Sequence, residues 1–597
     1  MILKQKTEGR KFKHIGKICL FLLLISAILF AVVPTANAAT YNESDVSVIR
    51  NIVLNNNWNY TLDEDPAKWN SDIFTWSEED SNKRITKLSL SLWDYELRGD
   101  LDVSKLNYLS ELDCSNNQLK SMKLPENLTV LDCTDLQLKE FPDLPKGLKV
   151  LNYRNCMLNS SDLSKLPAGL EELDCSGNNL TALPNLPANL KILRCSFNPL
   201  DSSDFLNLPD GLGWLICNDC QLTDLSGLPA ELEYLDCTNN NLTSLSGLPS
   251  GLKTLNCNSN PLGNSGLSNL PAGLEYLHCT DTQLTDLPDL PEGLKGLHVS
   301  FNNMENADFS KLPIDLEELW CREANLTSLK NLPNSLMFLD CSNNPLAELD
   351  VSGLNNLEYL SCEQSQLTKL ILPENLETLY CGNNRLTELD VSKLSNLGYL
   401  WCNSNQLTAL SDLPKNIDFL NCYGNQLTEL DVSELNNLKR LSCGENQLTV
   451  LSLPNCLEEL DCSYNKLTEF DVSMSNNLRW LNCSNNQLGS LTVTGLSNLE
   501  WLDCSYNKLT SLDTTGLDNL TDLRCDKNQL TVLDVSESSR LMWLSCRNNP
   551  IENLILPEND NLVVVKDTFT RTKFAILLVI FVLIGLVGVG LNLKKKK

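Results

Sequence analysis

The chain has 597 residues, a net charge of -29, 24 cysteines and only three histidines. Its apolar content of 42% is enough for a core and excludes wholesale disorder. The acidic balance argues against nucleic acid as a partner, because phosphate binding requires surfaces rich in Lys and Arg.

The first 38 residues are predicted to be a secretory signal peptide. Basic residues between Lys4 and Lys17 precede an apolar run from Ile18 to Val33, and Ala36-Asn37-Ala38 fits the small-residue cleavage pattern. The mature chain would then start at Ala39. An uncleaved signal anchor is the alternative interpretation of the same run.

Residues 39–84 do not fit the pattern that follows and are predicted to form an N-terminal cap. Residues 45–56 read as an amphipathic helix with Val46, Ile49 and Val53 on one face. Four tryptophans are expected to cluster around this helix: Trp58, Trp69, Trp76 and Trp93. Such a cap would cover the exposed end of a repeat array.

Residues 85–556 repeat one motif, LxxLxCxxNxL, in about 23 copies. The segment from Leu109 to Leu119 shows the pattern, with Cys114 at its reference position. This position recurs at spacings of 19 to 22 residues, and a Leu precedes it by two residues in each clear copy. We expect the Leu-x-Cys triplet to be a short strand whose Leu and Cys point inward.

This pattern resembles the leucine-rich repeat family, whose consensus has a period of 20–29 residues. The resemblance implies a β-dominated solenoid of the α/β class, a right-handed superhelix with a parallel β-sheet on its concave face. Short extended or 3-10 segments would form the convex face, since the period leaves no room for a long helix. The repeat sequences, with their Leu-Asp-Val-Ser linkers, are similar to those of bacterial cell-surface proteins of internalin-like layout.

Twenty cysteines occupy the inward position of the repeat, and Asn follows three residues later in most copies. Metal binding and disulfides between repeats are possible roles for the thiols, but a spacing of one repeat supplies no paired ligands. We therefore favour packing as small buried apolar groups. The Asn side chains are expected to form an internal hydrogen-bonded ladder.

The C-terminal part is predicted to close the array and anchor it. Residues 557–573 would form closure and stalk, 574–593 a transmembrane helix, and 594–597 a basic cytoplasmic tail. A processed cell-wall sorting signal is the alternative, although no LPxTG motif is present. The repeats would then lie outside the cell on a single-pass membrane protein, and residues 39–573 carry a charge of -38.

The outward positions of the predicted sheet hold 14 of the 38 aromatic residues, mostly in the second half. Aromatic side chains are enriched at binding hot spots, so these positions are candidate ligand contacts. The candidates are Trp320, Phe338, Tyr359, Tyr380, Tyr399, Trp401, Phe419, Tyr423, Trp480, Trp501 and Trp543. Mutual shielding of the sheet is the alternative role.

The sequence therefore predicts adhesion or surface recognition through a protein ligand. Binding of a glycan or cell-wall polymer through the aromatic rows is the alternative function. His278 and His298 are expected to stack on adjacent repeats, but two His without a carboxylate give a poor metal site. No catalytic motif is present, so we expect no enzyme activity, no cofactor and no metal.

Overall fold

The computed structural model describes residues 39–56, 60–79, 81–91, 96–136, 138 and 141–566. The chain divides into two units, which meet between Asn240 and Asn241 in the sequence. The predicted signal peptide, the predicted membrane segment, Trp58 and Trp93 lie outside the described residues. Among the residues that are described, no helix is both long and apolar enough to cross a membrane.

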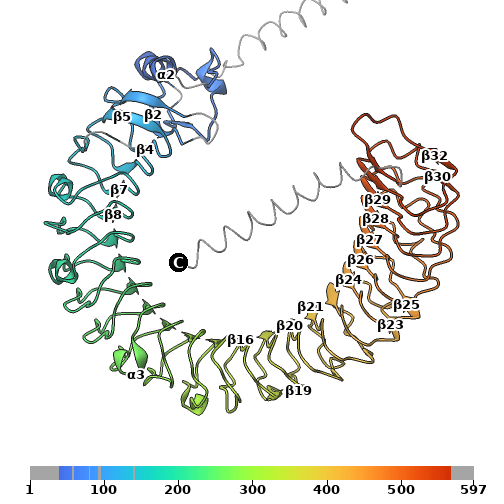
Figure 1. The fold of residues 1–597 in the computed structure, drawn as a ribbon. Coiled ribbons are helices and arrows are strands. Elements are labelled where there is room, and N and C mark those ends of the chain that lie inside the picture. Colours follow the sequence, from blue (N-terminus) through green and yellow to red (C-terminus); the bar gives the residue numbers. More distant parts are fainter. Residues whose placement is uncertain are drawn as a thin grey trace, which may run out of the picture. The chain divides into compact units, whose positions relative to one another are not determined.

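The first unit begins with a helix and continues as a stack of short strands (Figure 1). Its elements are α2 (Glu43–Asn55), η1 (Pro66–Lys68), β1 (Phe74–Trp76), β2 (Ile85–Ser89), β3 (Arg98–Asp102), β4 (Glu111–Asp113), β5 (Gln118–Lys123), β6 (Val130–Asp132), β7 (Val150–Asn152), η2 (Asp162–Lys165), β8 (Glu172–Asp174), β9 (Ile192–Arg194), η3 (Ser202–Asn207), β10 (Trp214–Ile216) and β11 (Tyr234–Asp236). Strand β1 pairs antiparallel with β2, and the repeat strands that follow pair in parallel.

The described elements of the second unit are three-residue strands, together with the short helix α3 and the 3-10 segment η4. They are β12 (Thr254–Asn256), α3 (Gly263–Gly266), β13 (Tyr276–His278), β14 (Gly296–His298), η4 (Phe309–Lys311), β15 (Glu318–Trp320), β16 (Phe338–Asp340), β17 (Glu348–Asp350), β18 (Tyr359–Ser361), β19 (Lys369–Ile371), β20 (Thr378–Tyr380), β21 (Tyr399–Trp401), β22 (Phe419–Asn421), β23 (Glu429–Asp431), β24 (Arg440–Ser442), β25 (Val450–Ser452), β26 (Glu459–Asp461), β27 (Trp480–Asn482), β28 (Trp501–Asp503), β29 (Asp522–Arg524), β30 (Val532–Asp534), β31 (Trp543–Ser545), β32 (Asn553–Ile555) and β33 (Val563–Val565).

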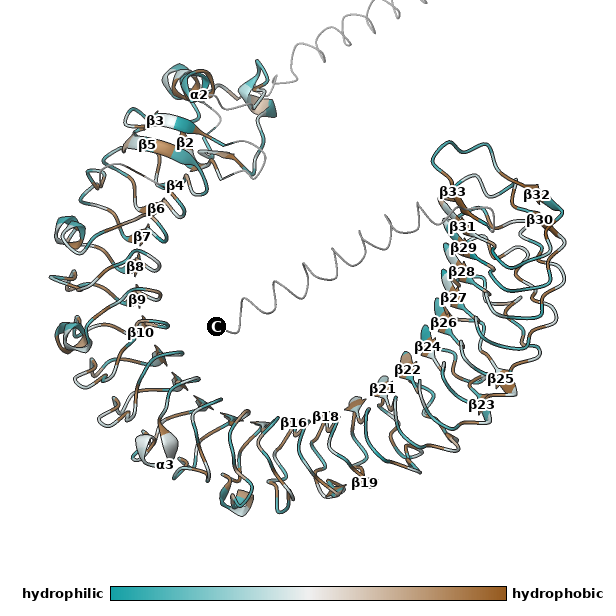
Figure 2. Cartoon of the chain, in the orientation of Figure 1, coloured by the Kyte–Doolittle hydropathy of each residue, from teal (hydrophilic) through white to brown (hydrophobic). Residues whose placement is uncertain are grey.

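Each repeat adds one strand to a parallel sheet, in register with the strand before it. Leu379 of β20, for example, lies opposite Leu360 of β18 and Leu400 of β21, and all three are buried. The residues that flank each Leu point out of the sheet, so apolar and polar positions alternate along the repeats (Figure 2). The predicted leucine-rich repeat solenoid, with a long parallel sheet and little helix, is confirmed.

The buried Asn of each repeat forms the predicted ladder. Nδ2 of Asn384 donates to the carbonyl oxygens of Cys362 (2.9 Å) and Cys381 (3.0 Å), and its Oδ1 accepts from the backbone N–H of Leu367 at 3.0 Å. One amide therefore joins two consecutive repeats and satisfies backbone groups that the turn leaves unpaired. The residue just before this Asn has a positive φ, such as 57° at Asn383.

The cysteines of the repeat pack as free thiols. Of the 23 described cysteines none forms a disulfide, and all are buried except Cys456, which is half-buried. Burial raises the pKa of the Cys279 thiol to about 12, which keeps it protonated at neutral pH. These observations support the packing role.

The far side of the second unit depends on the linker sequence. A second short strand forms where a Leu-Asp-Val-Ser linker is followed by a Leu-x-Leu-Pro linker in the next repeat, and the parallel pairs are β17 with β19, β23 with β25 and β30 with β32. The turn that follows β17 is held by Asp350, whose Oδ1 accepts from the N–H (3.1 Å) and the hydroxyl (2.7 Å) of Ser352. The other Pro-containing linkers form turns or 3-10 segments such as η4.

Helix α2 covers the start of the first unit, two residues earlier than predicted at its N-terminus. The predicted face of Val46, Ile49 and Val53 is wrong in part. Ile49 is buried, but the other two are only half-buried, and the buried face also includes Asp45. The buried face consists of Asp45, Val48, Ile49 and Ile52, and the Asp45 carboxylate on it accepts from Arg84, from Nε at 3.0 Å and from Nη2 at 2.9 Å. Val48, Ile49 and Ile52 have helical spacing, whereas the inward Asp45 and its ion pair are not visible in the hydrophobic periodicity.

Candidate functional site: an aromatic array on the sheet of the second unit

The eleven predicted contact residues all lie in the second unit. Ten belong to sheet strands between β15 and β31, and Tyr423 follows β22. Ten of the side chains are half-buried, and Tyr399 is 45% exposed. The outward orientation predicted for them agrees with this burial.

The register of the strands brings most of these rings into contact. Tyr380 lies opposite Trp401, and Tyr399 lies opposite Phe419, on neighbouring strands. Since adjacent strands are about 4.8 Å apart, rings at equivalent positions are close to stacking distance. We define the aromatic array as the connected set His278, His298, Trp320, Phe338, Tyr359, Tyr380, Tyr399, Trp401 and Phe419.

The tightest part of the aromatic array is a three-ring stack centred on Trp401. Its ring centroid lies 4.3 Å from that of Tyr380, at an interplanar angle of 17°, and 4.3 Å from that of Phe419, at 24°. Tyr359 continues the contacts with centroid distances of 5.7 Å to Tyr380 and 6.2 Å to Trp320. Stacking therefore covers both faces of the Trp401 ring and leaves its edge towards solvent.

Two tryptophans form a separate stack. The rings of Trp480 and Trp501 are 4.6 Å apart at 8°, and the Arg524 guanidinium lies 5.3 Å from the centre of the Trp501 ring. Arg524 also pairs with Asp522 at 3.1 Å. In the described part of the chain, Trp543 and Tyr423 make no ring contact, so the structure does not join them to either stack.

The aromatic array begins with the two predicted histidines. Their ring centroids are 4.1 Å apart, and His298 stacks on Trp320 at 5.4 Å. Burial, and secondly His278, lower the pKa of His298 to about 4, so it is neutral at physiological pH. Among the described residues no group of three or more His, Cys, Asp or Glu could hold a metal ion.

Two carboxylates interrupt the aromatic array. Asp340 on β16 is 9% exposed, and its Oδ1 accepts from the backbone N–H of Ser342 at 3.0 Å. Glu363, just after β18, is half-buried, and its pKa is raised by burial and secondly by Asp340. Trp320 lies nearby in register and has a buried indole N–H without a hydrogen-bond partner.

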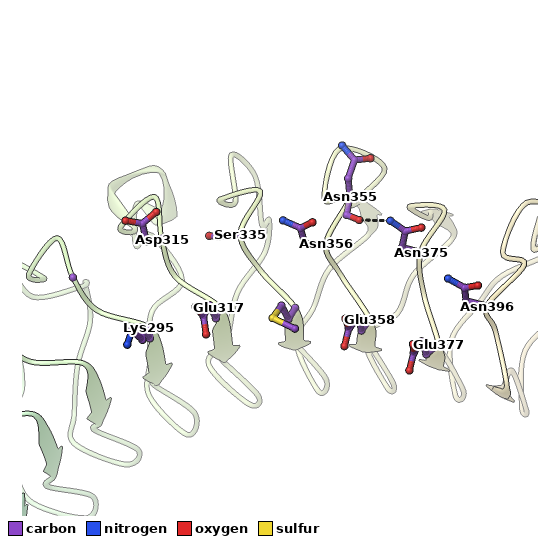
Figure 3. A pocket seen from close by; sticks show the side chains of 12 residues that line it. Lys295, Asp315, Glu317, Ser335, Asn355, Asn356, Glu358, Asn375, Glu377 and Asn396 are labelled. Atoms are coloured by element: carbon purple, nitrogen blue, oxygen red, sulfur yellow. Dashed lines mark hydrogen bonds between the residues drawn. The ribbon is translucent and has the colours of Figure 1, made fainter.

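A groove runs beside the array, along the ends where the strands begin (Figure 3). Its volume is about 860 Å³, and its walls include Glu317, Met337, Glu358 and Glu377. The asparagines above these residues come from the preceding loops, where Nδ2 of Asn375 donates to a backbone oxygen of the neighbouring repeat. This groove was not predicted from the sequence, because its walls lie outside the outward positions of the strands.

Aromatic rings at other outward positions of the sheet also make contacts that were not predicted from the sequence. Trp214 and Tyr234 of the first unit stack at 4.5 Å and 13°. Tyr276 on β13 lies over Gly296, where an added Cβ would come within 2.6 Å of its ring. The glycine therefore makes room for the ring, a signal that could have been read from the repeat alignment.

Comparison with known families matches several stretches of the repeat region. The family described as Leucine Rich repeats (2 copies) matches residues 374–415, and the family Leucine Rich Repeat matches 169–190, 477–499 and 498–523. No curated protein matches the chain.

Similar solved structures come from bacterial leucine-rich repeat proteins. YopM from Yersinia enterocolitica is 28% identical with a TM-score of 0.52, and the match covers 81% of this chain and 91% of that one. A leucine-rich repeat protein of Leptospira interrogans is 26% identical, with coverages of 66% and 93% and a TM-score of 0.39. The functional domain of InlJ from Listeria monocytogenes, described as including a cysteine ladder, is 29% identical, with coverages of 49% and 63% and a TM-score of 0.35.

Proposed function

Since this chain is a leucine-rich repeat protein, we propose that it binds another protein through the aromatic array. Proteins of this family are typically protein-binding and non-enzymatic. The observation that carries the proposal is the connected run of half-buried rings from His278 to Phe419. Such rings supply much contact area with little loss of side-chain entropy.

The ring geometry favours a protein over a glycan. Sugars stack on exposed ring faces, but the faces of Trp401 are covered by Tyr380 and Phe419. One face of Trp501 is covered by Trp480, and Arg524 lies over its ring. The tyrosines of the array also carry hydroxyl groups, which can donate to and accept from the polar backbone of a polypeptide.

We also propose that the repeats are displayed outside the cytoplasm on a single-pass membrane anchor. The support is the apolar run and cleavage pattern in residues 1–38, and the uncharged run from Phe574 to Leu591 followed by four lysines. Protease added to intact cells should then degrade the repeats of the full chain. Survival of the repeats until the cells are lysed would contradict this location.

Capture of partners by the full chain tests the binding site. Replacing Trp401 with Leu removes the centre of the stack and should reduce capture of the partner at least tenfold. Trp214→Leu is the matched control, because Trp214 belongs to an equally close stack in the first unit. Both variants should keep the thermal unfolding temperature of the parent within a few degrees.

A glycan array probed with the same proteins decides between the two ligand classes. We expect no glycan whose binding depends on Trp401. A glycan bound by the parent chain and by Trp214→Leu, but not by Trp401→Leu, would replace the protein ligand with the alternative.

A further inference from the structure

We propose that a partner inserts an Arg or Lys side chain between Asp340 and Glu363, so that the aromatic array receives a basic, extended polypeptide segment. The inference rests on the proposed function and deepens it by naming the chemistry of the ligand.

The first support is a buried carboxylate with one oxygen unused. Oδ1 of Asp340 accepts from the N–H of Ser342 at 3.0 Å, whereas its Oδ2 accepts no hydrogen bond from any described residue. Asp340 is only 9% exposed. Its Oδ2 is not among the fully buried atoms without a partner in the described residues, so this oxygen is open to a donor from outside, and a cationic donor forms the strongest hydrogen bond to a carboxylate.

Glu363 adds a second carboxylate to the same place. It lies one repeat further along and is half-buried, and Asp340 contributes to its raised pKa. No Lys or Arg among the described residues forms an ion pair with either carboxylate, and Arg322 pairs instead with Glu323 at 3.7 Å. An incoming cation would relieve the repulsion between the two carboxylates.

The neighbouring groove extends this charge. Glu317, Glu358 and Glu377 occupy one column of the repeat, at the beginning of their strands, and the described residues contain no ion pair to any of them. In the same column Glu275 pairs with Lys295 at 2.7 Å and Asp418 with Lys439 at 2.9 Å, whereas Glu458 is a further acid without an ion pair among the described residues. Three carboxylates without an ion pair therefore lie at the beginning of β15, β18 and β20, at the opposite end of the strands from Asp340 and Glu363.

The chain shows elsewhere how an aromatic ring and a carboxylate hold a cation. The Arg524 guanidinium lies over the Trp501 ring at 5.3 Å while its Nε is 3.1 Å from Asp522. At Asp340 the rings are Trp320 and Tyr359, and the carboxylates are present. The chain's own Arg322 acts on Glu363 only from a distance, lowering its pKa without an ion pair. A guanidinium or ammonium from a partner would complete the same combination of cation–π contact and ion pair.

The experiment is a tryptophan-fluorescence titration of the full chain with three ten-residue peptides, which alternate Ala with Arg, Gln or Glu. The Arg peptide should bind at least tenfold more tightly than the Gln peptide, and the Glu peptide should not bind. Raising the salt concentration should weaken the Arg complex, because ion pairs are screened. Equal binding of the Arg and Gln peptides would overturn the proposal.

Two near-isosteric variants locate the site. Asp340→Asn keeps the acceptor for Ser342, so the fold should persist. Both Asp340→Asn and Glu363→Gln should reduce the affinity for the Arg peptide at least fivefold. Asp174→Asn is the matched control, because Asp174 accepts from Ser176 at 3.0 Å in the same turn of another repeat. If both test variants bound the Arg peptide as tightly as the parent chain, the Arg side chain would not bind between Asp340 and Glu363.

The outcomes separate the two proposals. If a partner depends on Trp401 but neither on Asp340 nor on Glu363, the basic ligand is wrong and the binding function stands. If binding of the Arg peptide requires both carboxylates but capture of no protein partner requires Trp401, Asp340 and Glu363 form a cation-binding site and the proposed function fails.

Discussion

Each buried Asn of the repeat holds two turns of the chain together through one side chain. Asn384 donates to two Cys carbonyl oxygens and accepts from the N–H of Leu367, and it is only 7% exposed. Removal of this amide would leave several buried backbone groups without partners. Each such group costs about 1–3 kcal/mol.

Asn384→Ala should therefore lower the free energy of unfolding by about 3 kcal/mol, since neighbouring groups can relax in part. Denaturant unfolding followed by circular dichroism measures this loss. Asn396→Ala is the control, because Asn396 is an exposed Asn of the same unit and its loss should stay within about 0.5 kcal/mol. If both substitutions lowered the free energy of unfolding equally, the Asn ladder would not be a specific source of stability.

The thiols of the repeat should be chemically silent in the folded state. The thiolate is the reactive form, and burial raises the pKa of thiols such as Cys279 and Cys422 to about 12. A maleimide reagent at pH 7.5 should label Cys456, the half-buried exception, before any ladder cysteine. Mass spectrometry of the digested protein reads out the sites, and rapid native labelling of the ladder would contradict the packing role.

Among the elements, helix α2 is fixed to the first unit by a buried ion pair. The Asp45 side chain is fully buried and accepts from the Arg84 guanidinium and from the N–H of Ile85 at 3.0 Å. Asp45→Asn leaves the Arg84 charge poorly paired and should destabilise the cap by roughly 3 kcal/mol. The measurement is thermal unfolding, with Glu111→Gln as control, because Glu111 forms only an exposed pair with Lys87.

The strands of the sheet could be predicted from sequence, while other elements could not. The Leu-x-Cys triplet repeats with a fixed phase, so its inward face is readable wherever the motif occurs. The second strands, such as β17, have no such periodicity, and they form where a Leu-Asp-Val-Ser linker meets a Leu-x-Leu-Pro linker of the next repeat. On α2 the apolar residues Val46 and Val53 compete with Val48 and Ile52 for the buried face, and the inward Asp45 was missed because it is polar and pairs with a residue 39 positions away.

The sequence could predict which residues of the candidate site face outward, but not how their side chains contact one another. The repeat phase places Trp320, Tyr380 and Trp401 on the outward side, and the structure agrees. The stacking, by contrast, depends on rotamers and on which neighbour offers room, as at Gly296 beside Tyr276. The isolation of Trp543 and Tyr423 and the unpaired carboxylate of Asp340 likewise follow from three-dimensional neighbours rather than from spacing.

At the scale of the whole molecule, the repeats of a solenoid interact mainly with their nearest neighbours. In the second unit, each interior sheet strand pairs with the strand of the repeat before it and of the repeat after it, as β20 does with β18 and β21. A defect at one repeat should therefore spread only a short way along the chain. Its effect on stability should be local before it is global.

Hydrogen exchange of Asn384→Ala tests this locality. Amides of β18 and β20 should exchange faster than in the parent chain, because their repeats lose the hydrogen bonds of the Asn384 amide. Amides of β27 and β28, several repeats away, should keep the parent rate under native conditions. Asn507→Ala provides the reciprocal case, since Asn507 makes the same ladder bonds to Cys483 (2.9 Å) and Cys504 (3.1 Å). If either variant accelerated exchange uniformly over the second unit, that unit would open as one cooperative body, and nearest-neighbour coupling would not describe it.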